Sequence, residues 1–257
     1  MSHFLLNYPY SPSILFFIGS LFLIICAIFL FFKNRKNMRR VKNIGKKGEM
    51  AVQEKLDWYG CMDRLDNVVV GDIKNPKSMA EIDHIVRCED KFLVVEGKSW
   101  SGEIRGSAED EFWTLTSWQG QVWKRRNPLW QADRQRRILS HVTEGIPVEA
   151  VVIILGRNSF PDGIPEGVLN YDSVPQIRRI ARKNKDIETN PEDIDRVWSK
   201  IVEEQYSDFG REREKVYMKY LSKKRQLFPI WSRALVLGIA FSIIAILSAV
   251  FFRYYGG

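Results

Sequence analysis

Three side chains suited to phosphate chemistry lie within a short part of the chain: Asp83, Glu96 and Lys98. In proteins, Mg²⁺ binds one or two carboxylates and fills its remaining positions with water and phosphate oxygens. Water bound to such an ion is a better nucleophile. A lysine beside it orients that water or stabilises the charge that develops in the transition state. These residue types therefore predict metal-assisted hydrolysis of a phosphodiester.

Two predicted strands, residues 82–87 and 92–98, bring these side chains together across a short polar turn. A two-residue turn pairs residues whose numbers add up to 179, so Asp83 lies opposite Glu96 with Cβ atoms roughly 4.5–5.5 Å apart. Alternation along the second strand places Glu96 and Lys98 on one face. Two carboxylates at this distance repel each other unless a cation lies between them. A turn of odd length would move Asp83 to the other face, so the site depends on this register.

Two further polar residues are predicted to approach the same site. Residues 48–56 favour a helix, in which Glu49 shares a face with Val52 and supplies a third carboxylate. Asn127-Pro128 is typical of a helix start, with Asn as the N-cap and Pro in the first turn. Gln131 then lies in that first turn, where it can orient a water or a phosphate oxygen. Taken singly, each residue also fits a solvated helix position.

The order of elements predicts a single α/β domain, in which a mixed sheet is flanked by helices. Other short strands are predicted at residues 68–70, 112–115, 121–123, 151–155 and 168–171. The helix that starts at Pro128 is predicted to run to about Glu144 and to end at Gly145. Ser173 is expected to cap a helix that reaches Arg182, and an amphipathic helix is expected over about residues 192–225.

Both ends of the chain contain an uncharged, mostly apolar run of 19 residues, at 14–32 and 234–252. About 20 apolar residues cross the hydrocarbon core of a bilayer as a helix. We therefore predict a fold tethered by an N-terminal and a C-terminal transmembrane helix. Two buried core helices are an alternative, and so is a cleaved signal peptide for the first run. The first run, however, follows a segment without Lys or Arg and precedes no small-residue cleavage site.

The formal net charge of +8, from 39 basic and 31 acidic residues, is unevenly distributed. Eight basic residues and no acidic residue lie at positions 33–47, and residues 48–226 carry a charge of −2. The basic segments beside the two apolar runs place residues 33–226 in the cytoplasm and both termini outside the plasma membrane. The segment 33–47 is also expected to bind anionic lipid headgroups. The net positive charge is therefore chiefly a signal of topology.

A basic cluster surrounds Gln131 and is a candidate for holding a phosphate backbone. A solvated helix face explains it equally well. Tryptophans in the same region are able to stack on bases, although at least two are expected to pack in the core. The cluster consists of Lys124, Arg125, Arg126, Arg134, Arg136 and Arg137, and the tryptophans are Trp113, Trp118, Trp123 and Trp130.

The segments GEMAVQEKL, EIDHIVRCEDKFLVVEGKSWSGEIRG, NPLWQADRQ and VVIIL occur in this order. Together they resemble the NERD family, the nuclease-related domain, over about residues 45–181. That family is similar to the PD-(D/E)xK phosphodiesterases of restriction-endonuclease-like fold. The resemblance implies that Glu49, Asp83, Glu96 and Lys98 occupy active-site positions and that Gln131 matches a family glutamine. Gly97 departs from the family pattern, in which a larger apolar residue is usual between Glu and Lys.

We therefore expect a membrane-anchored, metal-dependent nuclease that acts on DNA or RNA. Asp83 and Glu96 would bind Mg²⁺ or Mn²⁺. Lys98 would position the attacking water, and Glu49 and Gln131 would assist. The alternatives are a non-catalytic membrane scaffold that binds nucleic acid or a protein, and an anchor for a protein complex with a vestigial site. The expected parts are a first transmembrane segment (1–33), a basic linker (34–47), the nuclease-like domain (48–190), a helical connector (191–226) and a second transmembrane segment (227–257).

Overall fold

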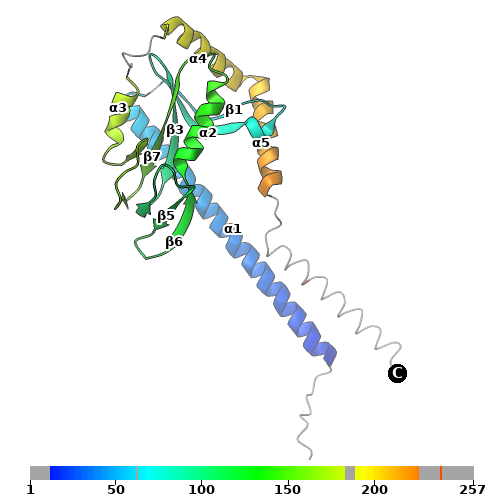
Figure 1. Ribbon diagram of the computed structural model, residues 1–257. Helices are drawn as coiled ribbons and strands as arrows, with labels where there is room; N and C mark the ends of the chain where they lie inside the picture. The colour runs from blue at the N-terminus through cyan, green and yellow to red at the C-terminus, as the bar shows by residue number, and fades with distance from the viewer. Residues whose placement is uncertain (1–11, 62, 183–188, 226–237, 239–257) are drawn as a thin grey trace, which may run out of the picture. The chain divides into compact units, whose positions relative to one another are not determined.

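The computed structural model describes residues 12–61, 63–182, 189–225 and 238 (Figure 1). The chain divides into two compact units. One consists of residues 43–223. The other consists of the two terminal stretches, residues 1–42 and 224–257. The long helix α1 (Pro12–Trp58) begins in the terminal unit and ends in the larger one.

A five-stranded sheet forms the centre of the larger unit, with the strand order β1-β2-β3-β7-β9. The first three strands are antiparallel, and β3, β7 and β9 are parallel, so the sheet is mixed as predicted. The parallel pairing of β3 with β7 requires a crossover, which contains helix α2 (Pro128–Ser140). The strands are β1 (Arg64–Val70), β2 (Ala80–Arg87), β3 (Phe92–Ser99), β7 (Val148–Leu155) and β9 (Val168–Asn170).

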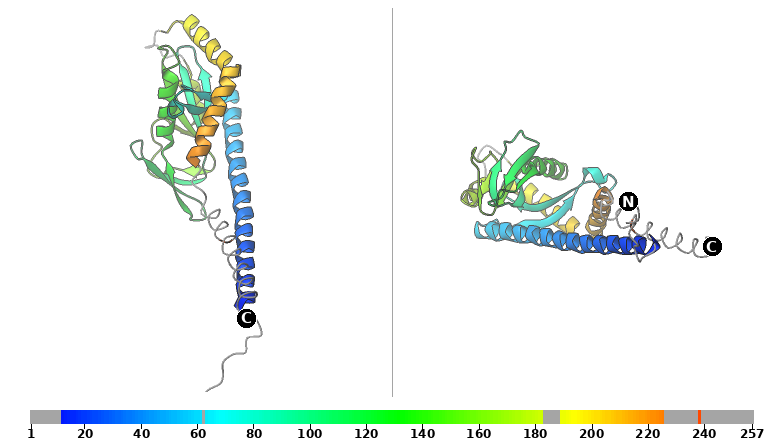
Figure 2. Two further views of the ribbon diagram at one scale, coloured as in Figure 1. Left: turned by 90° about the vertical axis from the view of Figure 1, so that its right-hand side faces the viewer. Right: turned by 90° about the horizontal axis from the view of Figure 1, so that it is seen from below.

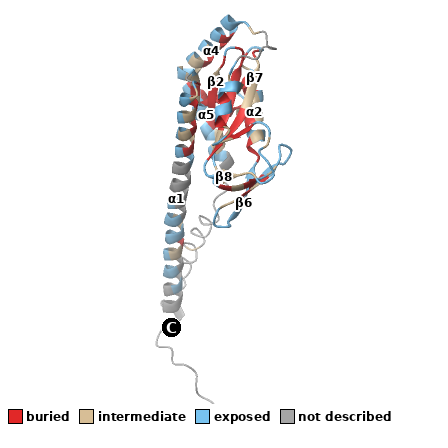
Figure 3. Ribbon diagram, turned by 90° about the vertical axis from the view of Figure 1, so that its left-hand side faces the viewer, coloured by how far each residue is buried: buried red, intermediate tan, exposed pale blue. Residues whose placement is uncertain are grey.

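Helices cover both faces of this sheet, and residues 92–95 of β3 are therefore buried on both sides. Phe92 and Val94 pack in a cluster with residues of α2 and of α4 (Pro191–Tyr206). Leu93 and Val95 pack in a second cluster with Val52 near the end of α1 and with residues of α3 (Ile177–Ile180). Figure 2 shows the sheet between α1 and α2 in the view from below. Figure 3 shows that the buried residues are concentrated on the strands.

A second, smaller sheet has the strand order β6-β5-β4-β8. It consists of β4 (Gly102–Arg105), β5 (Phe112–Thr116), β6 (Val122–Arg126) and β8 (Asn158–Ser159). Ile104, Trp113 and Leu115 on one of its faces pack against Val152 and Ile154 of the central sheet. Two of its strands were predicted from the sequence, but their separation into a sheet of their own was not.

Several helix boundaries differ from the sequence-based prediction. Helix α2 ends at Ser140 rather than near Glu144, because Glu144 and Gly145 adopt left-handed backbone conformations. The side chain of Ser173 caps no helix, since it bonds to Asn170 instead. A 3₁₀ turn (Val174–Gln176) and the short α3 follow.

The amphipathic stretch predicted at 192–225 is two helices, α4 and α5 (Asp208–Arg225). They separate at Ser207, whose backbone is extended. Ile194, Val197 and Ile201 of α4 are buried against the central sheet.

In the terminal unit, the first apolar run, residues 14–32, is helical as part of α1. The second run, residues 234–252, lies outside the described residues apart from Gly238. Within the described ranges, the helices do not combine the length and the apolarity that a crossing of the bilayer requires.

Candidate active site

The hairpin of β2 and β3 has the register that the sequence predicts. Its pairs run from Arg87 with Phe92 to His84 with Val95, and each pair adds up to 179. The paired residues end one position before Asp83 and Glu96, and the charge of Asp83 acts on Glu96. The Asp83 carboxylate accepts a hydrogen bond of 2.9 Å from the backbone N–H of Gly97. This bond holds the Asp83 side chain against the backbone of the residue that follows Glu96.

Glu96 is a buried carboxylate with 1% of its surface exposed. It accepts a hydrogen bond from the Lys98 ammonium and another, of 2.6 Å, from Gln135 Nε2. Burial raises the pKa of Glu96 to about 7, and the negative charge of Asp83 adds to the rise. The charge of Lys98 and the two hydrogen bonds oppose it. Asp83 and Glu96 thus interact as like charges in a poorly solvated place.

Lys98 joins the strand to helix α2. Its ammonium contacts Glu96 on one side and donates a hydrogen bond of 3.1 Å to Gln131 Oε1 on the other. About a fifth of its side chain is exposed (21%), and Gln131 itself is exposed. The line Glu96–Lys98–Gln131 therefore runs from the buried end of the site to solvent, where a substrate has access.

The N-cap residue of helix α2, Asn127, holds the first turn of the helix in place. The Asn127 side chain accepts from the Leu129 backbone N–H at 2.9 Å and donates to three carbonyls of the 107–110 loop. Asn127 is completely buried. The cap predicted from the sequence is confirmed. The extra bonds hold the first turn of α2 in place, and Gln131 contacts Lys98 from this turn.

The turn of α1 that carries Glu49 crosses the same end of β3. A Cβ atom on Gly48 would lie 2.5 Å from Ser99 Cβ, and one on Gly97 would lie 3.2 Å from Val52 Cγ2. Gly97 thus leaves the room that Val52 occupies, which is a physical reason for glycine at the position where the family pattern has a larger residue. Glu49 is half-buried on this turn.

No group of three or more His, Cys, Asp or Glu side chains with metal-binding geometry occurs in the part of the chain that the structure describes. Glu49 is therefore not arranged there as a third ligand beside Asp83 and Glu96. The acidic residues that the structure brings together are these two.

Gln135 is a member of the site that the sequence-based list of site residues omitted. It is 2% exposed, and its amide nitrogen donates both to Glu96 and to the Glu81 carbonyl at 3.0 Å. Its Oε1 is buried and accepts no hydrogen bond from the described residues. Gln135 lies four residues after Gln131, so the helical period from Gln131 was the signal that pointed to it.

The basic cluster around Gln131 separates into two groups. Arg134 donates to the carbonyls of Lys77 and Met79, and Arg136 and Arg137 pair with Asp133. These three arginines therefore have structural partners. The residues of β6, by contrast, are exposed along the whole strand.

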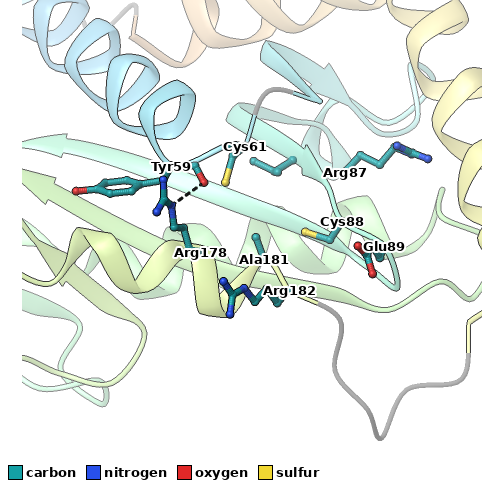
Figure 4. A pocket seen from close by; sticks show the side chains of 10 residues that line it. Tyr59, Cys61, Arg87, Cys88, Glu89, Arg178, Ala181 and Arg182 are labelled. Carbon is teal, nitrogen blue, oxygen red and sulfur yellow. Dashed lines mark hydrogen bonds between the residues drawn. The ribbon is translucent and has the colours of Figure 1, made fainter.

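A separate cavity of about 390 Å³ lies at the other end of β3, beside the turn that joins it to β2 (Figure 4). Its walls include the thiols of Cys61 and Cys88 and the arginines Arg178 and Arg182. Burial raises the pKa of Cys88 to about 12, so this thiol stays protonated. None of the predicted site residues lines this cavity.

A mixed sheet with Glu96 and Lys98 in the second half of β3 and Asp83 on the neighbouring β2 is an arrangement suited to hydrolysis of phosphodiesters. Residues 44–155 match the family model of the nuclease-related domain, NERD. The matched range contains Glu49, Asp83, Glu96, Lys98 and Gln131, and it confirms the resemblance found in the sequence. Residues 44–155 are thus similar to a nuclease-related domain, which suggests a nuclease-like function. Comparisons with curated proteins and with solved structures gave no match.

Proposed function

We propose that this protein is a metal-dependent nuclease that hydrolyses phosphodiester bonds of DNA or RNA. The observation that carries the proposal is the hydrogen-bonded line Glu96–Lys98–Gln131, with Asp83 beside it, inside a nuclease-related domain. A restriction-endonuclease-like arrangement of the central sheet is part of the same proposal. It is supported by the mixed strand order and by the position of Glu96 and Lys98 at the end of β3.

The residues at this site fit a hard divalent cation such as Mg²⁺ or Mn²⁺. Asp83 and Glu96 would hold the ion, because carboxylate oxygens are the ligands that such ions prefer. Two features support the fit: the Asp83 charge raises the pKa of Glu96, and the buried Gln135 Oε1 accepts no hydrogen bond from the described residues. When bound, the ion would neutralise the two carboxylates and polarise a phosphate oxygen or a water.

The other side chains position the reacting groups. Gln135 holds Glu96 through its amide N–H, which sets the direction of the carboxylate. Lys98 places a positive charge at the solvent end of the site, where it stabilises the charge that develops on the phosphate oxygens. Gln131 orients Lys98 from the helix side, and its exposed amide is available to a water or a phosphate oxygen.

We also propose that the protein is anchored in the plasma membrane by residues 14–32 and 234–252, with the nuclease-related domain in the cytoplasm and both termini outside. The support is the two uncharged runs of 19 residues and the eight basic residues at 33–47, which also suit anionic headgroups. A reporter enzyme fused after Gly257 tests the topology. Activity of a periplasmic or extracellular reporter is expected, and activity of a cytoplasmic reporter contradicts the proposal.

Cleavage by the full-length chain, purified in detergent, tests the reaction. DNA and RNA are incubated with Mg²⁺ or Mn²⁺, and Lys98→Ala is compared with Lys74→Ala, which removes an exposed lysine outside the site. We expect Lys98→Ala to lower the rate roughly 10²–10³-fold, the usual loss for one group that stabilises transition-state charge. Equal cleavage rates in both variants contradict the assignment of Lys98 to the active site. Nucleic-acid binding without cleavage under any of these conditions indicates the non-catalytic scaffold instead.

A further inference from the structure

The smaller sheet places an exposed strand beside the candidate active site. β4 begins three residues after β3 ends at Ser99, and β6 ends two residues before α2 begins at Pro128. The sheet is thus connected directly to the strand that carries Glu96 and to the helix that carries Gln131. Asn127 is the single residue between β6 and α2, and its buried hydrogen bonds fix this junction.

Strand β6 is the outer strand of this sheet, and all five of its residues are exposed. Trp123 has 37% of its surface exposed, and Trp118 in the turn before it has 52%. An arginine lies over each indole: Arg125 at 5.8 Å from the Trp123 ring and Arg157 at 5.4 Å from the Trp118 ring. Exposed apolar patches rimmed by polar residues mark interaction sites.

The charge of this surface is positive. Arg126 forms an ion pair with Glu111, but no ion pair is present for Lys124, Arg125 or Arg157 within the described ranges. Trp123 and Arg125 project on the same face of the hairpin, because they are two residues apart on one strand, whereas Lys124 between them projects on the opposite face. The surface therefore combines indole rings for stacking with cations for phosphate groups.

We propose that the β5–β6 hairpin, together with Trp118 and Arg157, binds single-stranded nucleic acid and delivers it to the site at the end of β3. This inference rests on the proposed function and names its substrate class. Stacking on an indole needs a base whose face is free, as in a single strand, whereas the bases of a duplex already cover one another. The unpaired cations supply the complementary charge for the backbone. A protein strand added to the edge of β6 would use main-chain bonds and would gain nothing from these cations.

Binding is measured with the full-length chain in EDTA, so that no cleavage occurs, by fluorescence anisotropy of a labelled oligothymidylate. Trp123→Ala is expected to weaken binding roughly 5- to 150-fold, the loss of one base-stacking contact. Arg125→Gln is expected to reduce the slope of log affinity against log salt by about 0.7, because it removes a cation on the same face as Trp123. Trp58→Ala and Arg179→Ala are the matched controls, because both residues are exposed and belong to other parts of the domain. Both controls are expected to bind as the parent does.

The inference is overturned by oligothymidylate binding that is unchanged in Trp123→Ala, or by binding of a duplex at least as tight as that of the single strand. Binding to vesicles of anionic phospholipid that requires Trp123, without any binding of oligothymidylate, also overturns it and assigns the hairpin to the membrane. The small diester bis(p-nitrophenyl) phosphate separates this inference from the proposed function. Its hydrolysis should require Lys98 and needs no nucleic-acid strand on the hairpin, so it reports on the proposed reaction alone. If the protein binds the oligonucleotide through Trp123 but hydrolyses neither substrate, the proposed nuclease function is refuted. The assignment of the hairpin as a binding surface is then retained.

Discussion

Glu96→Gln is expected to change how the stability of the domain depends on pH. In the folded protein, burial raises the pKa of Glu96 from an ordinary 4.5 to about 7. A carboxyl whose pKa is higher in the folded state than in the unfolded state stabilises the fold at pH values below its pKa in the unfolded state. That contribution to stability is lost as the pH rises through the pKa of the group in the folded state. The fold should therefore lose stability between about pH 4.5 and pH 7.

The magnitude follows from the two pKa values. At 1.36 kcal/mol for each pH unit, the difference corresponds to ~3 kcal/mol. Because Glu96 is 1% exposed, solvent screening reduces this figure little. Glutamine is neutral at every pH and has nearly the same shape, so Glu96→Gln should remove this part of the pH dependence. It also retains an oxygen that accepts the hydrogen bond from Gln135.

The assay is unfolding by urea, followed by tryptophan fluorescence of the detergent-solubilised full-length chain at pH 5 and pH 8 in EDTA. The parent is expected to lose about 2.5 kcal/mol more than Glu96→Gln between these two pH values, because part of the total loss occurs below pH 5. Glu212→Gln, which neutralises an exposed carboxylate of α5, serves as the control and should behave as the parent does. An identical pH dependence in the parent and in Glu96→Gln would refute the argument that burial governs this carboxyl.

Three other substitutions test the positioning of the site. Gln135→Met removes the amide that donates a hydrogen bond to Glu96, and it should lower the free energy of unfolding by about 1–3 kcal/mol. Because that hydrogen bond lowers the pKa of Glu96, the pH–activity profile should also move to higher pH. An unmoved profile contradicts the role of Gln135. Gly48→Val should cost about 1–3 kcal/mol in thermal unfolding, because its Cβ meets Ser99, whereas Gly45→Val has open space and should cost less. Asn127→Ala removes a cap and three carbonyl contacts and should destabilise the protein more than Asn190→Ala, which removes the cap of α4 alone; equal losses contradict the role of the junction.

Local patterns were sufficient for the elements that carry most of the site. The β-branched runs located β2 and β3, and the short polar turn between them set the register that brings Asp83 to Glu96. Asn127-Pro128 identified the start of α2 and the place of Gln131 in its first turn. These predictions succeeded because hairpin register and helix capping depend on a few consecutive residues.

Long-range packing decided what those patterns left open. The contact of Gln135 with Glu96 joins residues 39 positions apart, and it exists because α2 packs across β3. The same is true of Val52 against Gly97, which brings the end of α1 to the site. The break between α4 and α5 and the early end of α2 also escaped the sequence pattern, because an amphipathic period continues through a short interruption of the backbone.

By itself, the sequence determined which residue types were available for the chemistry, the strand that carries Glu96 and Lys98, and the match of residues 44–155 to the model of the nuclease-related domain. Only the tertiary structure decided how strongly Glu96 is desolvated, which amide holds it, and where the exposed hairpin with Trp123 lies relative to the site. The physical reason is that burial and solvation depend on every element packed around a group, and those elements come from distant parts of the chain.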